Sequence, residues 1–118
     1  MPNKNKTEPK KQLSPLALDL IASRFRALSE PMRLRLLDLL MQVDQTIGQL
    51  VESTGSSQAN ISKHLSVLRE AGMIAMRKDG LTTVCQIADP IVGELCEMMC
   101  SRLRDEMEGK AQAFGAGT

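Results

Sequence analysis

The sequence has little aromatic character: it contains no tryptophan or tyrosine, two phenylalanines and a single histidine in 118 residues. A folded core therefore has to be built from aliphatic side chains and from the eight methionines, which serve best as core filling. The sequence also shows no glycine-rich phosphate loop, no nucleophile–base pair and no second histidine. These absences argue against an enzyme.

Long apolar runs are missing as well. No run approaches the roughly 20 residues that cross a bilayer, and the opening residues, MPNKNKT, lack the apolar segment of a signal peptide. We therefore expect a cytoplasmic protein without membrane contact, whose three cysteines are reduced thiols. The formal net charge is only +1, so the charge balance alone does not indicate nucleic acid. Basic residues nevertheless gather between residues 56 and 80, and acidic residues follow from residue 94 on.

Residues 56–72 predict the element around which the chain is organised. Ile61, Leu65 and Leu68 recur at spacings of four and three, which is one stripe of an amphipathic helix. The other face offers short polar and basic groups that can hydrogen-bond phosphates and base edges: Ser57, Gln58, Asn60, Ser62, Lys63 and His64. A short helix over about residues 46–53 precedes it, across a turn that contains Gly55. This outline is typical of a helix-turn-helix, whose second helix, the recognition helix, reads the major groove. An ordinary solvated helix gives the same stripe.

Helical patterns also occupy much of the rest of the chain. Serine and proline stand where two helices would begin, because serine caps a helix and proline fits its first turn. The expected helices cover about residues 15–27, 31–41 and 90–108. They belong to a single domain over residues 14–108, between a disordered basic arm over residues 1–13 and a flexible tail over residues 109–118.

Two β-type runs indicate a hairpin after the recognition helix. They cover residues 73–78 and 81–87 and are separated by Asp79-Gly80, a strong signal for a two-residue turn. Arg77 and Lys78 would project from this hairpin as a basic wing beside the recognition helix. The element order is then α-α-α-α-β-β-α, a mainly α winged helix-turn-helix.

The first and last helices carry more apolar surface than one small domain needs. Pairing them across a two-fold axis would bury that surface and place two recognition helices about 34 Å apart, which is one turn of DNA. The sequence therefore predicts a homodimer on double-stranded operator DNA. Lys63, Arg77 and Lys78 are expected on phosphates, and the other polar residues of the recognition helix near base edges. An architectural DNA-binding protein is the alternative.

Two stretches resemble the ArsR/SmtB family of bacterial winged-helix repressors. Residues 27–37 read ALSEPMRLRLL and are similar to the opening of that family's domain. Residues 61–72 read ISKHLSVLREAG and are similar to its recognition helix almost residue for residue. The resemblance covers about residues 14–105. It implies a homodimeric repressor that leaves its operator when an effector binds, in this family a soft or transition metal, a persulfide or an oxidant.

The usual metal sites of that family are not matched. Thr46 and Gly48 stand where the thiol site ahead of the recognition helix has its Cys-x-Cys pair. Asp89 matches the first ligand of the zinc site on the last helix, but Ile91 and Arg102 stand where histidines are needed. A zinc site of that type is therefore not expected, because zinc prefers histidine and cysteine ligands.

The three cysteines form a different candidate site. Cys96 and Cys100 are four residues apart on the last helix, so both face the same way. Cys85 lies across the bend into that helix, where similar sequences usually carry a tyrosine. Three converging thiolates would suit As(III), Sb(III) or another soft metal ion as the releasing effector. The alternatives are a persulfide or redox sensor using the same thiols, a site of Cys96 and Cys100 only, and inert core cysteines in an effector-blind protein.

Overall fold

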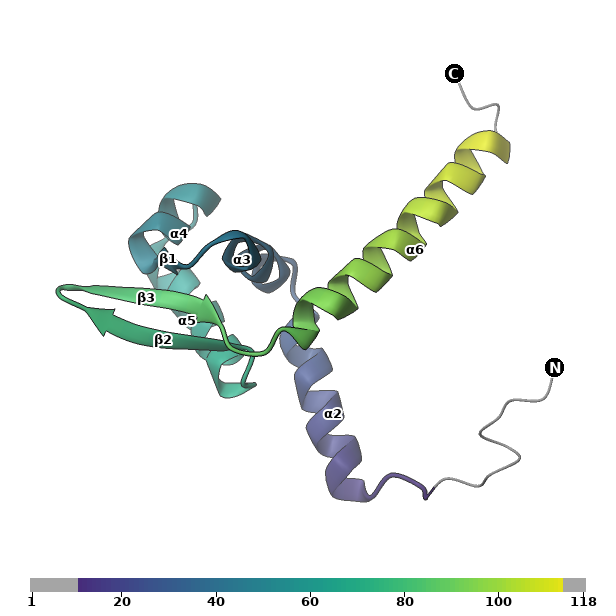
Figure 1. The fold of residues 1–118 in the computed structure, drawn as a ribbon, viewed down its shortest axis with the longest axis horizontal. Coiled ribbons are helices and arrows are strands. Elements are labelled where there is room, and N and C mark those ends of the chain that lie inside the picture. Colours follow the sequence, from purple (N-terminus) through teal and green to yellow (C-terminus); the bar gives the residue numbers. More distant parts are fainter. Residues whose placement is uncertain (1–10, 114–118) are drawn as a thin grey trace.

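The computed structural model describes residues 11–113, with side chains over residues 11–110 (Figure 1). Eight elements follow one another within this range: α2 (Pro15–Leu28), α3 (Pro31–Gln42), β1 (Gln45–Thr46), α4 (Ile47–Thr54), α5 (Gln58–Glu70), β2 (Ile74–Asp79), β3 (Thr82–Ile87) and α6 (Ile91–Ala113). Most of the predicted arm, residues 1–10, and the last part of the predicted tail, residues 114–118, lie outside the described residues.

The predicted winged helix-turn-helix is confirmed. Helices α4 and α5 form the helix-turn-helix, and β2 and β3 form the hairpin that follows it. Local side-chain caps explain where the helices begin, because each cap satisfies a backbone N–H of the first turn. Ser14 accepts a hydrogen bond from the amide of Ala17 at 3.1 Å, and Thr46 and Gln49 form a reciprocal capping box at the start of α4.

The sheet has one more strand than the sequence predicts. No strand is predicted ahead of the recognition helix, but Gln45 and Thr46 form the short strand β1, which pairs with β3 opposite Cys85 and Val84. The strand order is β1-β3-β2, with both pairings antiparallel. A two-residue strand has no periodicity of its own, so only its non-local partner reveals it.

The turn at the tip of the hairpin is displaced by one residue from its predicted position. Asp79 still pairs with Thr82, so the two turn residues are Gly80 and Leu81 rather than Asp79 and Gly80. The φ angle of Gly80 is +64°, and no described residue other than glycine has a positive φ. A glycine at the first central position fits the type II′ hairpin turn, which explains why the hairpin forms despite the shift.

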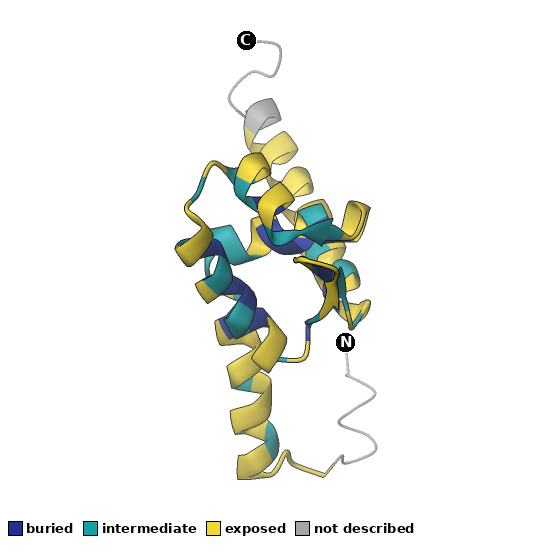
Figure 2. Cartoon of the chain, turned by 90° about the vertical axis from the view of Figure 1, so that its left-hand side faces the viewer, coloured by how far each residue is buried: buried dark blue, intermediate teal, exposed yellow. Residues whose placement is uncertain are grey.

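The core lies where α3, α4 and α5 meet the sheet, and it is aliphatic, as the sequence predicts. Figure 2 shows the buried segments at the centre of the molecule and exposed segments along both projecting helices. The fully buried large side chains are Leu36, Leu37, Leu50, Ile61, Leu65, Leu68, Cys85 and Val92. Phe25, by contrast, is exposed on α2.

Helices α2 and α6 extend away from the core in different directions (Figure 1). The radius of gyration of the Cα atoms is 18.6 Å, against about 13 Å for a compact chain of this length. Large apolar side chains lie exposed on both helices: Leu16, Leu18, Leu20, Ile21, Phe25, Ile91, Leu95, Met98, Met99, Leu103 and Met107. None of the described helices is both long and apolar enough to span a membrane.

The last helix is longer than predicted. We expected α6 to end near Glu108 and a tail to begin at Gly109, but the helix continues to Ala113. A glycine inside a helix costs only about 1 kcal/mol relative to alanine, which does not end a helix by itself.

Candidate DNA-binding surface and cysteine sites

The turn between α4 and α5 sets the start of the recognition helix. Gly55 ends α4 with a φ of +72°, in the left-handed region that suits glycine. Ser57 then caps α5 by accepting a hydrogen bond from the amide of Asn60 at 3.1 Å. Arg35 of α3 supports the end of α4, because its guanidinium donates to the carbonyl oxygen of Ser53 at 2.7 Å. The end of α4 and the first turn of α5 are thus each held by a side-chain hydrogen bond.

Most of the predicted DNA-contacting residues of α5 lie on its accessible side. Ser57, Gln58 and Lys63 are exposed, and Asn60 and Ser62 are half-buried. The side-chain amide of Asn60 donates from Nδ2 to Ser56 Oγ at 2.8 Å, so part of its hydrogen-bonding capacity is used within the turn. The surface therefore offers three exposed polar side chains, two of them at the N-terminus of the helix, where backbone N–H groups favour phosphate. Contact of these residues with DNA stays a prediction.

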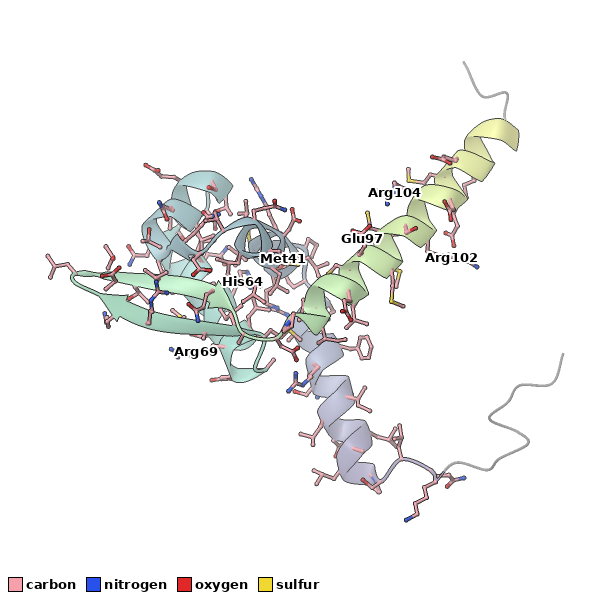
Figure 3. All side chains as sticks on the ribbon, viewed as in Figure 1. Met41, His64, Arg69, Glu97, Arg102 and Arg104 are labelled. Atoms are coloured by element: carbon pink, nitrogen blue, oxygen red, sulfur yellow. The ribbon has the colours of Figure 1, made fainter. Side chains whose placement is uncertain are left out.

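His64, also predicted to contact DNA, lies instead on the inner side of α5. Only 9% of its surface is exposed, and the ring lies within the domain (Figure 3). Its Nδ1 atom is 3.3 Å from Nη1 of Arg33, and its Nε2 atom is 3.7 Å from Oε2 of Glu30. The inward position of His64 could have been read from its spacing. The i, i+3, i+4, i+7 pattern of one helix face is formed by Ile61, His64, Leu65 and Leu68. Its polarity suggested the outer face, but its position in the sequence places it inside.

The wing carries both predicted basic residues, but they do not act as one patch. Arg77 and Lys78 are exposed on β2. Neighbouring residues of a strand point to opposite faces, so only one of them lies on a given side of the hairpin. Arg77 donates to Gln86 Oε1 at 2.9 Å and lies 3.9 Å from a carboxylate oxygen of Asp44. Its charge is therefore partly balanced within the chain.

The three cysteines differ in environment, and one protomer does not bring them together. Cys85 is completely buried on β3, Cys96 is half-buried and Cys100 is exposed. Among the described residues, which include all three, no group of three or more cysteine, histidine or acidic side chains is arranged to hold a metal ion. One protomer thus does not show the predicted convergence of three thiolates among its described residues, and an effector site of all three cysteines stays a prediction. Cys85 faces the core, whereas α6 carries Cys100 away from the body.

Burial makes two of these thiols weaker acids. It raises the pKa of Cys85, and burial together with the negative charges of Asp38 and Cys100 raises the pKa of Cys96. The thiolate is the reactive form, so both side chains react slowly near neutral pH.

Alkylation tests these environments. At about pH 8 we expect iodoacetamide to modify Cys100 first, Cys96 more slowly, and Cys85 only after unfolding, because access decreases in that order and burial raises the pKa of Cys96 and Cys85. Mass spectrometry of peptides from a time course measures the three rates. Modification of Cys85 at the rate of Cys100 in the folded protein would contradict its placement in the core.

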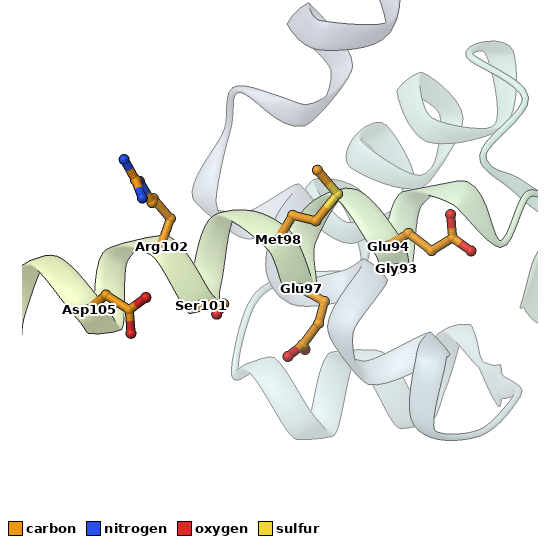
Figure 4. Close-up of a pocket in the computed structure, with 7 residues that line it drawn as sticks. All are labelled: Gly93, Glu94, Glu97, Met98, Ser101, Arg102 and Asp105. Carbon is orange, nitrogen blue, oxygen red and sulfur yellow. The ribbon is translucent and has the colours of Figure 1, made fainter. Parts of the chain in front are cut away.

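A hollow of about 830 Å³ lies along one side of α6 (Figure 4). All of its lining residues belong to this single helix: Gly93, Glu94, Glu97, Met98, Ser101, Arg102 and Asp105. A ligand pocket normally has walls from several elements and encloses most of its ligand. This hollow is therefore open helix surface rather than a small-molecule site.

An exposed polar helix after a tight turn, with a hairpin beside it, defines a winged helix-turn-helix DNA-binding protein. Residues 30–76 match the family model described as bacterial regulatory protein, arsR family. An HTH-type transcriptional regulator of Mycobacterium tuberculosis, Rv0081, is 42% identical over 77 residues, which cover 64% of this chain and 68% of that protein. The chain belongs to the ArsR family. It is accordingly a DNA-binding transcriptional regulator and not an enzyme.

Other relatives and solved structures agree with this assignment. A "Probable mercury resistance operon repressor" of Streptomyces lividans is 39% identical over 77 residues, covering 65% of this chain and 62% of that protein. The crystal structure of Rv0081 has a TM-score of 0.74 and 34% identity, covering 84% of this chain and 99% of that one. A homodimeric winged helix-turn-helix domain of Mycobacterium bovis has a TM-score of 0.75 at 24% identity, covering 86% and 94%, and supports the fold alone.

Proposed function

We propose that the protein is a homodimeric repressor that binds a double-stranded operator through α5 of each protomer, with the β2–β3 hairpin beside it. The observation that carries this proposal is the exposed polar side of α5, held directly after the Gly55 turn. Repression is supported by the relative from Streptomyces lividans, whose name describes a repressor. Lys63, Arg77 and Lys78 are assigned to phosphates, and Ser57, Gln58, Asn60 and Ser62 to base edges or sugar-phosphate oxygens.

The dimer in this proposal forms through α2 and α6. Both helices expose large apolar side chains along their length. Burying such surface is favourable at about 25 cal/mol per Å² of apolar area. The Mycobacterium bovis domain of the same fold is homodimeric.

We further propose that a thiophilic effector releases the repressor by binding Cys96 and Cys100. The two sulfur atoms lie one turn apart on α6, and Cys100 is exposed. Soft thiolate ligands select soft metal ions, so As(III), Sb(III) and Hg(II) are the candidate effectors. The mercury resistance relative favours a metal of this class. Cys85 takes no part in this site.

The raised pKa of Cys96 favours a metal over an oxidant or a persulfide. An oxidant or persulfide needs a thiolate that is already formed, whereas a metal ion displaces the thiol proton as it binds. Cys96 also packs against the core where α6 meets α3. An ion that bridges Cys96 and Cys100 would pull the Cys96 sulfur out of this contact and shift α6, and with it the distance between the two recognition helices.

The test is fluorescence anisotropy on a duplex taken from the DNA upstream of the protein's own gene. We expect tight binding, and release by arsenite or Hg(II) at concentrations close to that of the protein. A Cys96→Ser, Cys100→Ser variant should bind the duplex equally well and no longer be released. Cys85→Ala is the matched control and should be released like the unmodified chain.

The alternatives give different outcomes in the same titration. Release by persulfide or peroxide and not by metals would replace the metal with a redox effector at the same thiols. An affinity that no thiophile changes would identify an effector-blind protein with inert cysteines. Failure to bind any upstream duplex would contradict the operator assignment itself.

A further inference from the structure

Arg33 connects the end of α2 to the recognition helix. Its guanidinium donates from Nε to the carbonyl oxygen of Ala27 at 2.7 Å and from Nη2 to that of Arg26 at 3.1 Å. These carbonyls belong to the last turn of α2, and that of Arg26 also accepts hydrogen bonds from the backbone N–H and the hydroxyl of Ser29. The remaining contact, from Nη1, reaches Nδ1 of His64 at 3.3 Å. One side chain of α3 thus holds both α2 and α5.

This contact determines which nitrogen of His64 carries the proton. A guanidinium is always protonated and can only donate, so Nδ1 of His64 has to be the acceptor. A ring that accepts at Nδ1 carries its proton on Nε2, which faces the Glu30 carboxylate at 3.7 Å. Glu30 is itself fixed, because Oε2 accepts a hydrogen bond from the amide of Met32 at 3.2 Å at the start of α3. The ring lies between a cation that donates and an anion that attracts its N–H.

Packing alone does not require a histidine at this position. The neighbours of His64 on the inner face of α5 are Ile61, Leu65 and Leu68, and all three are fully buried. An aliphatic side chain would continue that stripe without the cost of burying a polar ring. A buried polar contact at this position fixes the orientation of α5, because a hydrogen bond is directional. Aliphatic packing would leave that orientation adjustable.

We propose that His64 is a positioning residue, whose ring between Arg33 and Glu30 fixes the orientation of α5 relative to the end of α2. This inference rests on the proposed function, in which α2 belongs to the dimer interface and α5 reads the operator. The Glu30–Arg33–His64 contact then aligns the two recognition helices on the two half-sites, and His64 itself does not contact DNA.

A set of single and double variants tests this assignment through operator affinity. His64→Gln and His64→Leu remove the acceptor at the Nδ1 position, and each is expected to weaken operator binding about tenfold, as for a lost charge-assisted hydrogen bond. His64→Asn keeps an acceptor near that position and should stay within about threefold of the unmodified protein. Arg33→Met and the double variant Arg33→Met, His64→Leu should bind equally weakly, because both substitutions remove the same contact.

Other measurements separate positioning from a general loss of structure. All variants are compared for thermal unfolding and dimer mass, and sequence preference within a half-site should not change in any of them. The ¹⁵N spectrum of the imidazole is unambiguous, because the chain has one histidine. It should show the proton on Nε2 at neutral pH.

Each contrary result has a definite meaning. Additive losses in the Arg33 and His64 cycle, full activity of His64→Gln, or a proton on Nδ1 would overturn the positioning role while leaving the operator proposal intact. A changed preference at one base pair in His64→Leu would show that His64 reads DNA after all. Failure of the unmodified protein to bind any duplex would overturn both proposals.

Discussion

Replacing Leu103 by arginine is expected to convert the proposed dimer into monomers and to lower operator affinity at least a hundredfold. Leu103 is 48% exposed in the single protomer and lies on one stripe of α6 with Leu95, Met99 and Met107, at spacings of four residues. When this stripe is buried in the dimer interface, a guanidinium at position 103 would lose its hydration without gaining a partner, which costs several kcal/mol. A monomer then binds one half-site without the gain of about 10²–10⁴ that a second linked site supplies. Sedimentation velocity and anisotropy on the same samples measure both effects.

Val43→Arg is the matched control for this change. Val43 is 60% exposed at the end of α3, so the substitution adds the same charge on an exposed apolar position outside α2 and α6. It should leave dimer mass and operator affinity within about twofold of the unmodified protein, since isolated surface substitutions rarely change stability by more than ~0.5 kcal/mol. An intact dimer in Leu103→Arg would show that α6 does not form the interface.

The helices and the hairpin could be predicted because their signals are local. Ser14, Thr46 and Ser57 each cap a helix through a residue three positions away, and Gly55 ends α4 with its own backbone angle. Strand β1 carried no such signal, because its two residues become a strand only when β3, some 40 residues later, pairs with them.

The candidate sites also depend on contacts between residues that lie far apart in the sequence. The polar side of α5 follows from helical spacing, but the inward position of His64 depends on Arg33, which lies 31 residues earlier in the chain. The cysteines were predicted to converge because a bend joins Cys85 to the last helix. Whether they do so depends on which face of β3 is buried and on the direction of α6, and both are set by tertiary packing.

Lys63→Glu is expected to abolish most operator binding, with a loss of about a hundredfold or more at ~0.1 M salt. Lys63 is exposed on α5, and we assign its ammonium group to a phosphate at the edge of the groove. Each phosphate contact changes the slope of log K against log salt by about 0.9. Lys63→Ala should therefore weaken binding to all sequences and reduce the slope by about one per protomer, or about two per dimer.

Gln58→Ala distinguishes this electrostatic loss from a loss of base recognition. Gln58 is exposed in the first turn of α5 and carries no charge, so its removal should leave the salt slope unchanged. It should instead alter the preference at one base pair of each half-site, by about 1–3 kcal/mol if its amide binds a base edge. A salt slope that stays the same in Lys63→Ala would remove Lys63 from the phosphate-binding surface. In that case the exposed side of α5 contacts DNA without a charged side chain on a phosphate, and the basic residues of the hairpin have to make the phosphate contacts.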